Sequence, residues 1–293
     1  KQLASTADVV MENFAPGTMD RLGCGFEVLS ADNPGLIFCS LKGFLSGPYE
    51  HRPALDEVVQ FMGGLAYMTG PPGQPLRAGA SVIDILGGTY AVVGILAALQ
   101  ERNRTGKGQV VRSSLYESTT FLMGQHMAGQ TVTGRLTPPM PAREGAWGIY
   151  EPFATADDEQ VFIGITSDNH WRRFCEHFER ADLFENEAYR TNEDRVRERP
   201  TLLGIVAEIA VHYTKAELIA IFDRIDIPFA PVVRPDELFD DPHLNESGQL
   251  LDVEIQEGLF TKLPKLPIEI GAHDVGGLRS QPPRPGEHSR DIL

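Results

Sequence analysis

The stretch SVIDILGGTYAVVGILAALQERNRTGKG, which begins at Ser81, sets one carboxylate, Asp84, in an apolar run just before Gly87 and Gly88. A carboxylate at a helix N-terminus is held ionised by the helix dipole and by free N–H groups. The same N–H groups can stabilise an oxyanion that forms nearby, and glycine backbone lets a ligand approach closely. Asp84 could therefore act as a nucleophile towards an activated acyl group.

A purely structural interpretation of Asp84 is also open. Asp is favoured as an N-cap, because its carboxylate accepts bonds from the first free N–H groups of a helix. Gly87 and Gly88 could then pack tightly against a neighbouring element. Against this interpretation, two glycines in the first turn weaken a helix by about 1 kcal/mol each relative to Ala. Such a loss of helix stability is explained if a ligand must come close to the helix backbone.

The elements around Asp84 are predicted to alternate between strands and helices, which indicates an α/β architecture with a parallel sheet. Apolar runs predict strands at 8–11 and 36–41 and over QVVRSSLYES, residues 109–118. Helical spacing and stop signals predict helices at 18–22, 55–61, 85–102 and 119–129.

The pattern changes after residues 134–148. A hairpin with TADDEQ as its turn, a helix capped by Ser167 or Asp168, and a strand at IPFAPVV follow. We therefore predict a large α/β domain at 1–148, a smaller α+β domain at 149–225, and a return of 226–293 to the large domain. The chain opens as if within a domain, so we expect the first strand of the large domain to be missing.

Composition narrows the classes of function. The net charge of −15 argues against a nucleic-acid partner, because such binding depends on Lys and Arg. The three cysteines have no metal-ligand spacing and indicate reduced thiols in a cytoplasmic protein, and the scattered histidines predict no metal site. The best apolar run, 90–99, has about half of the roughly 20 residues that span a bilayer. We expect no membrane partner.

Several segments resemble the class III (CaiB/BaiF-type) CoA-transferases. They are ADVVMENFAPGTMDRLG, SLKGFLSGPYEHRPALDEVVQFMGGLAYMTG, SVIDILGGTYAVVGILAAL and RTGKGQVVRSSL. Later, FATADDEQVFIGITSDNHWRRFCEHF, IPFAPVVRPDELFDDPH and PPRPGEHSRDIL match the same family in the same order. The resemblance covers nearly the whole chain. It implies a Rossmann-like open parallel sheet in the large domain, a smaller α+β domain, and an interlocked homodimer.

The resemblance implies that Asp84 is the catalytic nucleophile. Asp84 would attack an acyl-CoA thioester to form a mixed anhydride, which CoA thiolate would open to an aspartyl-CoA thioester, releasing the donor acid. The acceptor carboxylate would attack that thioester and then receive CoA. Acyl-CoA and CoA are thus expected as substrates, with no permanently bound cofactor.

The resemblance also implies which residues bind CoA. They form a loop after a strand, a basic residue near the nucleotide end, and a segment that lines the pantetheine and active site. These residues are Asn13, Phe14 and Ala15; Arg21; and Arg52, Pro53, Ala54 and Leu55. The loop position agrees with the rule that open α/β sheets bind ligands beyond the carboxyl ends of their strands.

The substrate side is assigned to Gly87, Gly88 and Arg77. Arg52, Arg77 and Arg143 lie in loops that flank the expected site, and one planar guanidinium could hold a second carboxylate on the substrate. These arginines could equally bind CoA phosphates or lie on the surface. The stretch from Ser40 to Gly79 most resembles members that use succinyl-CoA and C4 or C5 dicarboxylates. We therefore predict a dicarboxylate acceptor such as malate, itaconate or mesaconate.

Two alternative functions stay open. One is an α-methylacyl-CoA racemase or epimerase of the same fold, whose branch has a His before the Asp of its GHD element. This chain has ALD, with Leu55 in that place, so the partner base is missing. The other is a non-catalytic CoA-binding subunit paired with an unlike chain. Asp84 followed by Gly87 and Gly88 argues against a dead subunit.

Overall fold

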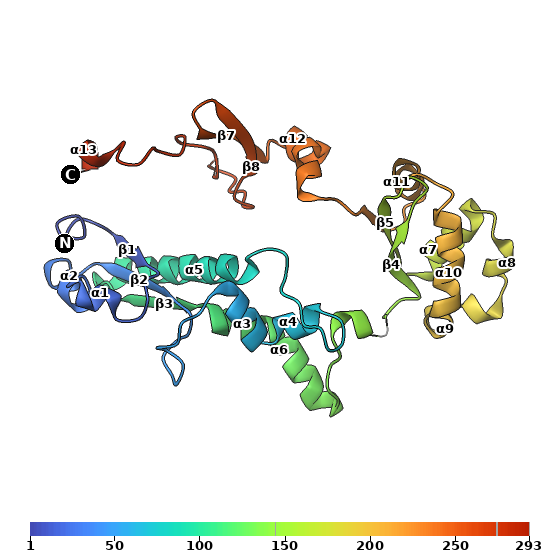
Figure 1. Ribbon diagram of the computed structural model, residues 1–293, viewed down its shortest axis with the longest axis horizontal. Helices are drawn as coiled ribbons and strands as arrows, with labels where there is room; N and C mark the ends of the chain where they lie inside the picture. The colour runs from blue at the N-terminus through green and yellow to red at the C-terminus, as the bar shows by residue number, and fades with distance from the viewer. Residues whose placement is uncertain (144, 274, 293) are drawn as a thin grey trace. The chain divides into compact units, whose positions relative to one another are not determined.

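The computed structural model describes residues 1–143, 145–273 and 275–292, and Figure 1 shows its helices and strands. Contacts between residues divide the chain into two compact units, Lys1–Glu144 and Gly145–Leu293.

The first unit is built on a three-stranded parallel sheet. Its strands are β1 (Val9–Glu12), β2 (Ile37–Lys42) and β3 (Val110–Ser114), in the order β1-β2-β3. β1 and β2 lie within one residue of their predicted positions, whereas the third predicted strand ran to Ser118 and β3 ends at Ser114, where the next helix begins. The register sets Glu12 opposite Ser40, and Lys42 opposite Ser114. The predicted α/β class with a parallel sheet is confirmed for this unit.

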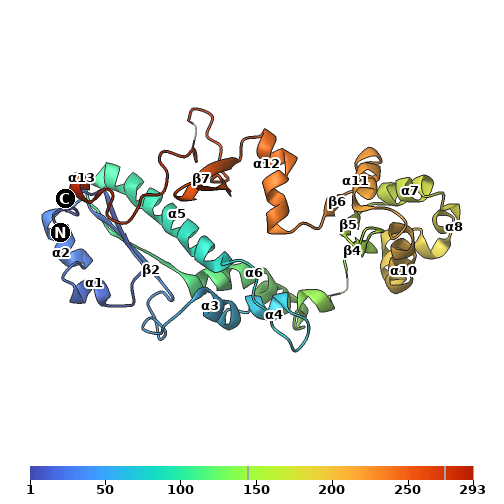
Figure 2. The same cartoon turned by 45° about the horizontal axis from the view of Figure 1, so that its top comes forward.

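Helices connect these strands. They are α1 (Thr18–Arg21), α2 (Phe26–Asp32), α3 (Asp56–Met62), α4 (Leu65–Thr69), α5 (Val82–Thr105) and α6 (Leu115–Thr133), with a short 3-10 helix, η1 (Met140–Ala142). Figures 1 and 2 agree that α5 runs alongside the sheet, where it contacts β2 and β3. On β2, Phe38 packs in a cluster with Leu29 of α2. Alternating β2 side chains point to opposite faces of the sheet, so Ser40 and Lys42 share the face of Phe38.

Helix α5 is longer than the sequence predicted. It begins at Val82 rather than at residue 85, with Ser81 as its N-cap, and it ends at Gly106 in the left-handed conformation. Asp84 is therefore the third residue of the helix and not its N-cap. Gly87 and Gly88 fall in the second turn, and not in the first as predicted.

The expectation that no segment could span a bilayer is wrong for α5. By length and composition alone, this helix of 24 residues could cross a membrane. The apolar run at 90–99 is bounded by Thr89 and Gln100, whereas the helix continues through both residues. Its contacts with β2 and β3 favour a helix that packs on the sheet.

The second unit contains an antiparallel sheet in the order β4-β5-β6. Its strands are β4 (Ile149–Ala154), β5 (Gln160–Ile165) and β6 (Phe229–Pro231), followed by a separate hairpin of β7 (Leu250–Gln256) and β8 (Leu259–Pro264). The predicted hairpin and the strand in IPFAPVV are confirmed. Because β6 pairs with β5, this sheet extends past residue 225. The return of 226–293 to the large domain stays a prediction.

Helices pack around the β4-β5-β6 sheet to form the core of the second unit. The helices of the unit are α7 (Asp168–His177), α8 (Ala181–Phe184), α9 (Asn192–Arg197), α10 (Arg199–Ala210), α11 (Lys215–Arg224), α12 (Pro242–Glu246) and α13 (Ser289–Ile292), with 3-10 helices η2 (Glu187–Tyr189) and η3 (Pro235–Asp240). The Ser167 side chain accepts a bond from the His170 N–H, which confirms one of the two predicted caps. Cys175 is a core residue, and burial raises the pKa of its thiol to about 12.

Candidate active site

A pocket of about 580 Å³ lies at the carboxyl ends of β1 and β2 in the first unit. It gathers the loop after β1, the loop between β2 and α3, the start of α5 and the start of α6. Its lining residues are Asn13, Phe14, Ala15, Pro16, Leu41, Lys42, Gly43, Arg52, Pro53, Ala54, Leu55, Asp56, Asp84 and Leu115. A nucleophile candidate and both predicted CoA-binding segments therefore share one pocket.

Four predicted site residues are not among those that line this pocket: Arg21, Arg77, Gly87 and Gly88. The Arg21 guanidinium donates to the Thr18 hydroxyl at 2.8 Å, within its own helix. Arg77 forms an ion pair with Glu57, and its Nε donates to the Ala78 carbonyl at 3.1 Å. The roles assigned to these four residues stay predictions.

Arg52 is the arginine that does line the pocket. Its guanidinium lies over the Tyr49 ring, 4.0 Å from the centroid. Tyr49 packs in turn against Phe44 and Tyr116, at ring-centroid distances of 5.8 and 6.3 Å. This stacking holds a planar cation at the pocket wall without neutralising it, because the aromatic partner carries no charge.

The start of α5 is capped by a carboxylate from another helix. Asp56, the first residue of α3, is buried, and its Oδ2 accepts the N–H groups of Ile83 and Asp84 at 2.8 and 3.1 Å. The free N–H groups that usually need a local cap are thus satisfied across the fold. Asp84 is left with its carboxylate in the pocket and its backbone held by Asp56.

The environment of Asp84 raises the pKa of its carboxyl. Partial burial is the larger cause, and the negative charge of Asp56 is the second. The sequence predicted the opposite, a carboxylate held ionised by the free N–H groups of its helix. That expectation fails because burial disfavours the charged form, and because Asp56 accepts those N–H groups and repels a second negative charge.

Asp56 is itself held by a polar chain. The Gln60 amide, fully buried, donates to Asp56 Oδ1, and its carbonyl oxygen accepts the Ala78 N–H at 2.9 Å. Because both oxygens of Asp56 have partners, its carboxylate is fixed between α3 and α5. These hydrogen bonds also connect the loop before α5 to α3.

Gly87 has a packing role. It is buried, and its carbonyl accepts the Ser113 hydroxyl at 2.7 Å. A Cβ at Gly87 would lie 3.1 Å from Leu115 Cδ2, whereas one at Gly88 would meet no heavy atom within 4 Å. The packing interpretation left open by the sequence therefore fits Gly87, and Gly88 faces open space.

Sequence reasoning missed Asp56, Gln60, Lys42 and Glu12 as parts of the site. Asp56 and Gln60 are four residues apart in ALDEVVQ, so they lie on one face of α3. The signal available in the sequence was this carboxylate and this amide on a helix face that is otherwise apolar. Glu12 and Lys42 end neighbouring strands, and only the strand register shows that they meet.

A family model described as CoA-transferase family III matches residues 1–289. The chain belongs to this family. This confirms the resemblance found in the sequence and identifies a CoA-transferase enzyme.

Characterised relatives and solved structures agree with this assignment. Succinate–glutarate CoA-transferase from Agrobacterium fabrum is 31% identical over 299 residues, which cover 100% of this chain and 73% of the relative. Succinyl-CoA–D-citramalate CoA-transferase from Chloroflexus aurantiacus is 30% identical over 301 residues, with the same coverage. A crystal structure of a CaiB/BaiF family protein from Brucella suis is 30% identical, with a TM-score of 0.87 over 99% of this chain and 75% of that one.

The glycines of α5 in this CoA-transferase provide a matched pair of substitutions. A Cβ at Gly94 would lie 2.6 Å from Val111 Cγ1 on β3, a stiff β-branched neighbour. We expect Gly94→Ala to lower the free energy of unfolding by about 1–3 kcal/mol. Gly88→Ala should raise it by about 0.5–1 kcal/mol, because Ala favours the helix and meets open space. Urea unfolding measures both.

The same variants separate the two roles considered for Gly88. If its backbone contacts the substrate, Gly88→Ala should slow CoA transfer although it stabilises the fold. Unchanged transfer in a stabilised Gly88→Ala protein would contradict a substrate contact. Equal stabilities of the Gly94 and Gly88 variants would contradict the packing described for α5.

Proposed function

We propose that this family III CoA-transferase moves CoA from succinyl-CoA to a small dicarboxylic acid, through an aspartyl-CoA thioester on Asp84. The observation that carries the proposal is the pocket in which Asp84 lies together with the 13–15 loop and the 52–55 segment. Its position beyond the carboxyl ends of parallel strands is where open α/β sheets bind ligands.

The chemistry follows from a carboxylate nucleophile. Asp84 attacks the thioester carbon, a C–O bond forms, and the C–S bond breaks to give a mixed anhydride and CoA thiolate. The thiolate attacks the Asp84 acyl carbon and expels the donor carboxylate. The acceptor carboxylate then displaces CoA thiolate from Asp84, and the thiolate attacks the acceptor acyl carbon, which restores the Asp84 carboxylate.

A dicarboxylate substrate is supported by two observations. By their names, four relatives act on glutarate, D-citramalate, mesaconate and L-malate, each with succinate or succinyl-CoA as the other partner. In this chain, Arg52 lines the Asp84 pocket with its guanidinium not paired to a carboxylate among the described residues. Its planar fork suits a second carboxylate on malate, itaconate or mesaconate.

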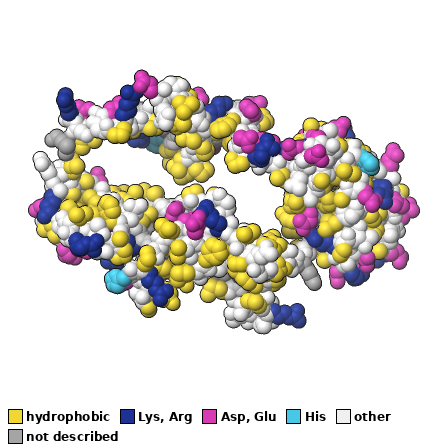
Figure 3. Space-filling view, in the orientation of Figure 1, with side chains coloured by type: hydrophobic (Ala, Val, Ile, Leu, Met, Phe, Trp, Pro, Cys, Tyr) yellow, Lys and Arg dark blue, Asp and Glu magenta, His cyan; other side chains and the backbone are white. Residues whose placement is uncertain are grey.

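Three further features belong to this proposal: a Rossmann-like large domain, an interlocked homodimer and a cytoplasmic location. The dimer is supported by exposed apolar side chains along α5, namely Ile85, Val92, Val93 and Leu96. Figure 3 shows apolar side chains gathered over much of the visible face of the first unit. The location is supported by three cysteines that are free thiols.

The first test measures the intact mass of the protein after incubation with succinyl-CoA and hydroxylamine. A hydroxamate on Asp84 supports the covalent transferase. Exchange of an α-proton into solvent without an adduct would instead favour the racemase, and CoA binding with neither signal would favour a non-catalytic subunit. Within the described residues, no group of three or more His, Cys, Asp or Glu side chains could hold a metal ion, so the assay is first run without added metal.

The acceptor is tested by comparing dicarboxylates with monocarboxylates of equal chain length. Arg52→Gln and Arg77→Gln remove the same charge, but only Arg52 lines the pocket. We expect Arg52→Gln to reduce the preference for dicarboxylates by about tenfold or more, because a charge-assisted bidentate contact is lost. Loss of that preference in Arg77→Gln alone would transfer the role to Arg77.

A further inference from the structure

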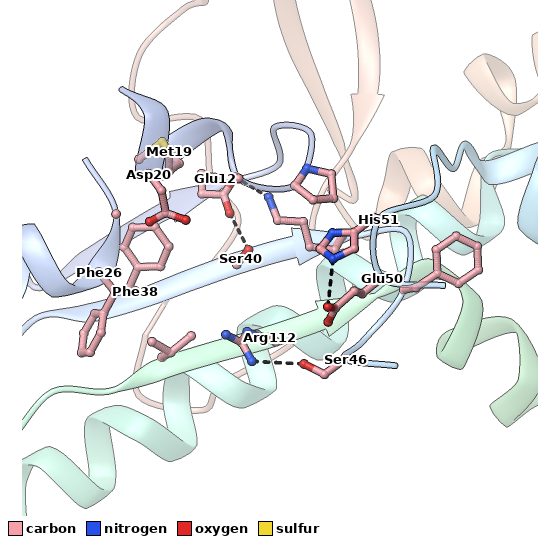
Figure 4. A pocket seen from close by; sticks show the side chains of 16 residues that line it. Glu12, Met19, Asp20, Phe26, Phe38, Ser40, Ser46, Glu50, His51 and Arg112 are labelled. Atoms are coloured by element: carbon pink, nitrogen blue, oxygen red, sulfur yellow. Dashed lines mark hydrogen bonds and ion pairs between the residues drawn. The ribbon is translucent and has the colours of Figure 1, made fainter. Parts of the chain in front are cut away.

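A buried carboxylate lies at the end of β1, beside the loop that is expected to bind CoA. The Glu12 side chain is 4% exposed, and each of its oxygens is bonded. Oε1 accepts the Ser40 hydroxyl from the neighbouring strand, as Figure 4 shows, and Oε2 accepts the Phe14 N–H at 2.9 Å. A buried ionised carboxylate needs such partners, because burial otherwise favours its neutral form.

Lys42 completes this arrangement from the end of β2. Its ammonium lies 2.7 Å from Glu12 Oε2 and donates to the Phe14 carbonyl at 2.6 Å. The two charged side chains therefore hold both backbone polar groups of Phe14. We call Glu12 and Lys42 together the clasp.

The clasp borders two pockets. Lys42 lines the Asp84 pocket, and with Glu12 it also lines a smaller pocket of about 260 Å³. Figure 4 shows this second pocket, where Arg112 bonds to Ser46 and His51 pairs with Glu50. Lys42 thus stands in the wall that faces the nucleophile, with two of its three N–H donors directed to Glu12 and Phe14.

The loop has few other restraints. Residues 13–15 belong to neither a helix nor a strand, and the Phe14 side chain is exposed. The described backbone bonds of this segment include one from the Thr18 N–H to the Ala15 carbonyl at 3.1 Å. The conformation of Phe14 therefore depends on the clasp more than on secondary structure.

We infer that Glu12 and Lys42 are positioning residues, which hold the 13–15 loop in the conformation that binds the CoA moiety. This inference rests on the proposed function, because it takes that loop as a CoA contact. The strands fix where Glu12 and Lys42 lie, and the clasp transmits that position to the loop. The clasp acts on binding, so it should change the affinity for CoA more than the rate of the chemical step.

The test uses Lys42→Met, Glu12→Gln and the double variant, with Ser40→Ala as the matched control. Ser40→Ala removes a bond to the same carboxylate but leaves both bonds of Lys42 in place. We expect Lys42→Met to raise the Kd of CoA, measured by calorimetry, and the KM of succinyl-CoA by about tenfold or more. The kcat should stay within about threefold, which is the signature of lost ground-state binding.

Amide hydrogen exchange of the ligand-free protein gives a readout that does not need turnover. Exchange at Phe14 should be faster in Lys42→Met and Glu12→Gln than in wild type or Ser40→Ala. The Lys42→Arg variant keeps the charge and should recover part of the affinity. The double variant carries no unpaired buried charge, so it remains informative if a single variant unfolds.

The outcomes distinguish failure of the clasp inference from failure of the proposed function. If wild type binds CoA and Lys42→Met binds equally well with unchanged Phe14 exchange, the clasp inference is overturned and the proposed function stands. Equal loss of affinity in Ser40→Ala and Lys42→Met would also overturn it, because general weakening of the sheet would explain both. If wild type does not bind CoA, the proposed function fails and the inference fails with it.

Discussion

Asp84→Asn is expected to abolish the hydroxylamine-trapped adduct and to lower the rate of CoA transfer by about 10³-fold or more. The Asn amide keeps the shape of the side chain but cannot form the anhydride, so the covalent route is lost. CoA affinity should change little, because the 13–15 loop and the 52–55 segment are untouched. Intact mass, single-turnover transfer and calorimetry measure the three quantities.

The matched control for this change is Glu101→Gln, a carboxylate of the same helix that is paired with Arg104. It should leave transfer and adduct formation unchanged. An adduct of full yield in Asp84→Asn would remove Asp84 from the mechanism. Loss of CoA binding in Asp84→Asn would assign this carboxylate to binding instead.

The pH dependence of adduct formation should carry the signature of Asp84. Only the ionised carboxylate is nucleophilic, and burial together with Asp56 raises the pKa of Asp84. A raised pKa means that the protonated, unreactive form persists to higher pH. The rate should therefore fall, on acidification, at a pH above the ordinary range of an aspartate.

Asp56 is the second residue whose substitution should have a large effect. Asp56→Ala leaves the buried Ile83 N–H without an acceptor, which should lower the free energy of unfolding by about 1–3 kcal/mol. Because the start of α5 also loses its anchor, we expect transfer to fall by about 10–100-fold. Chemical unfolding and single-turnover kinetics measure the two effects.

Asp56→Asn separates charge from position. One oxygen can still accept from α5, but the negative charge is gone, so the pKa of Asp84 should fall. The acid limb of adduct formation should then move to lower pH. Some stability will be lost, because the Asn amide N–H group would face the Gln60 N–H group, and neither can accept a hydrogen bond from the other.

Glu57→Gln is the control for both Asp56 variants, since it follows Asp56 on α3 and pairs with Arg77 outside the pocket. Its pH profile should match that of wild type. If Asp56→Asn leaves the acid limb at the same pH, or moves it to higher pH, the electrostatic effect assigned to Asp56 is contradicted.

Local patterns in the sequence predicted much of the fold because strands and helices here follow their apolar spacing. The strand predicted at 36–41 is β2 (Ile37–Lys42), and the Ser167 cap is present. The start of α5 was misplaced because its cap comes from Asp56, which lies 28 residues before Asp84. No local spacing reveals a cap that a different helix supplies.

The site was predicted in part for the same reason. Asp84 and the two CoA segments were found by motif, and one pocket contains them all. Glu12 and Lys42 were missed because they meet only through the parallel register of β1 and β2. Arg77 was assigned because it lies in a loop that flanks the expected site, but it pairs with Glu57 in the structure.

The borrowed cap of α5 has a consequence for how a mixed anhydride on Asp84 would be opened. The positive end of the helix serves Asp56 rather than Asp84, and burial together with the charge of Asp56 raises the pKa of Asp84. A carboxylate with a raised pKa leaves an anhydride less readily than an ordinary aspartate would, so attack of the thiolate on the donor carbon, which must expel Asp84, is slowed. Asp56 would thus hinder the return of CoA to the donor.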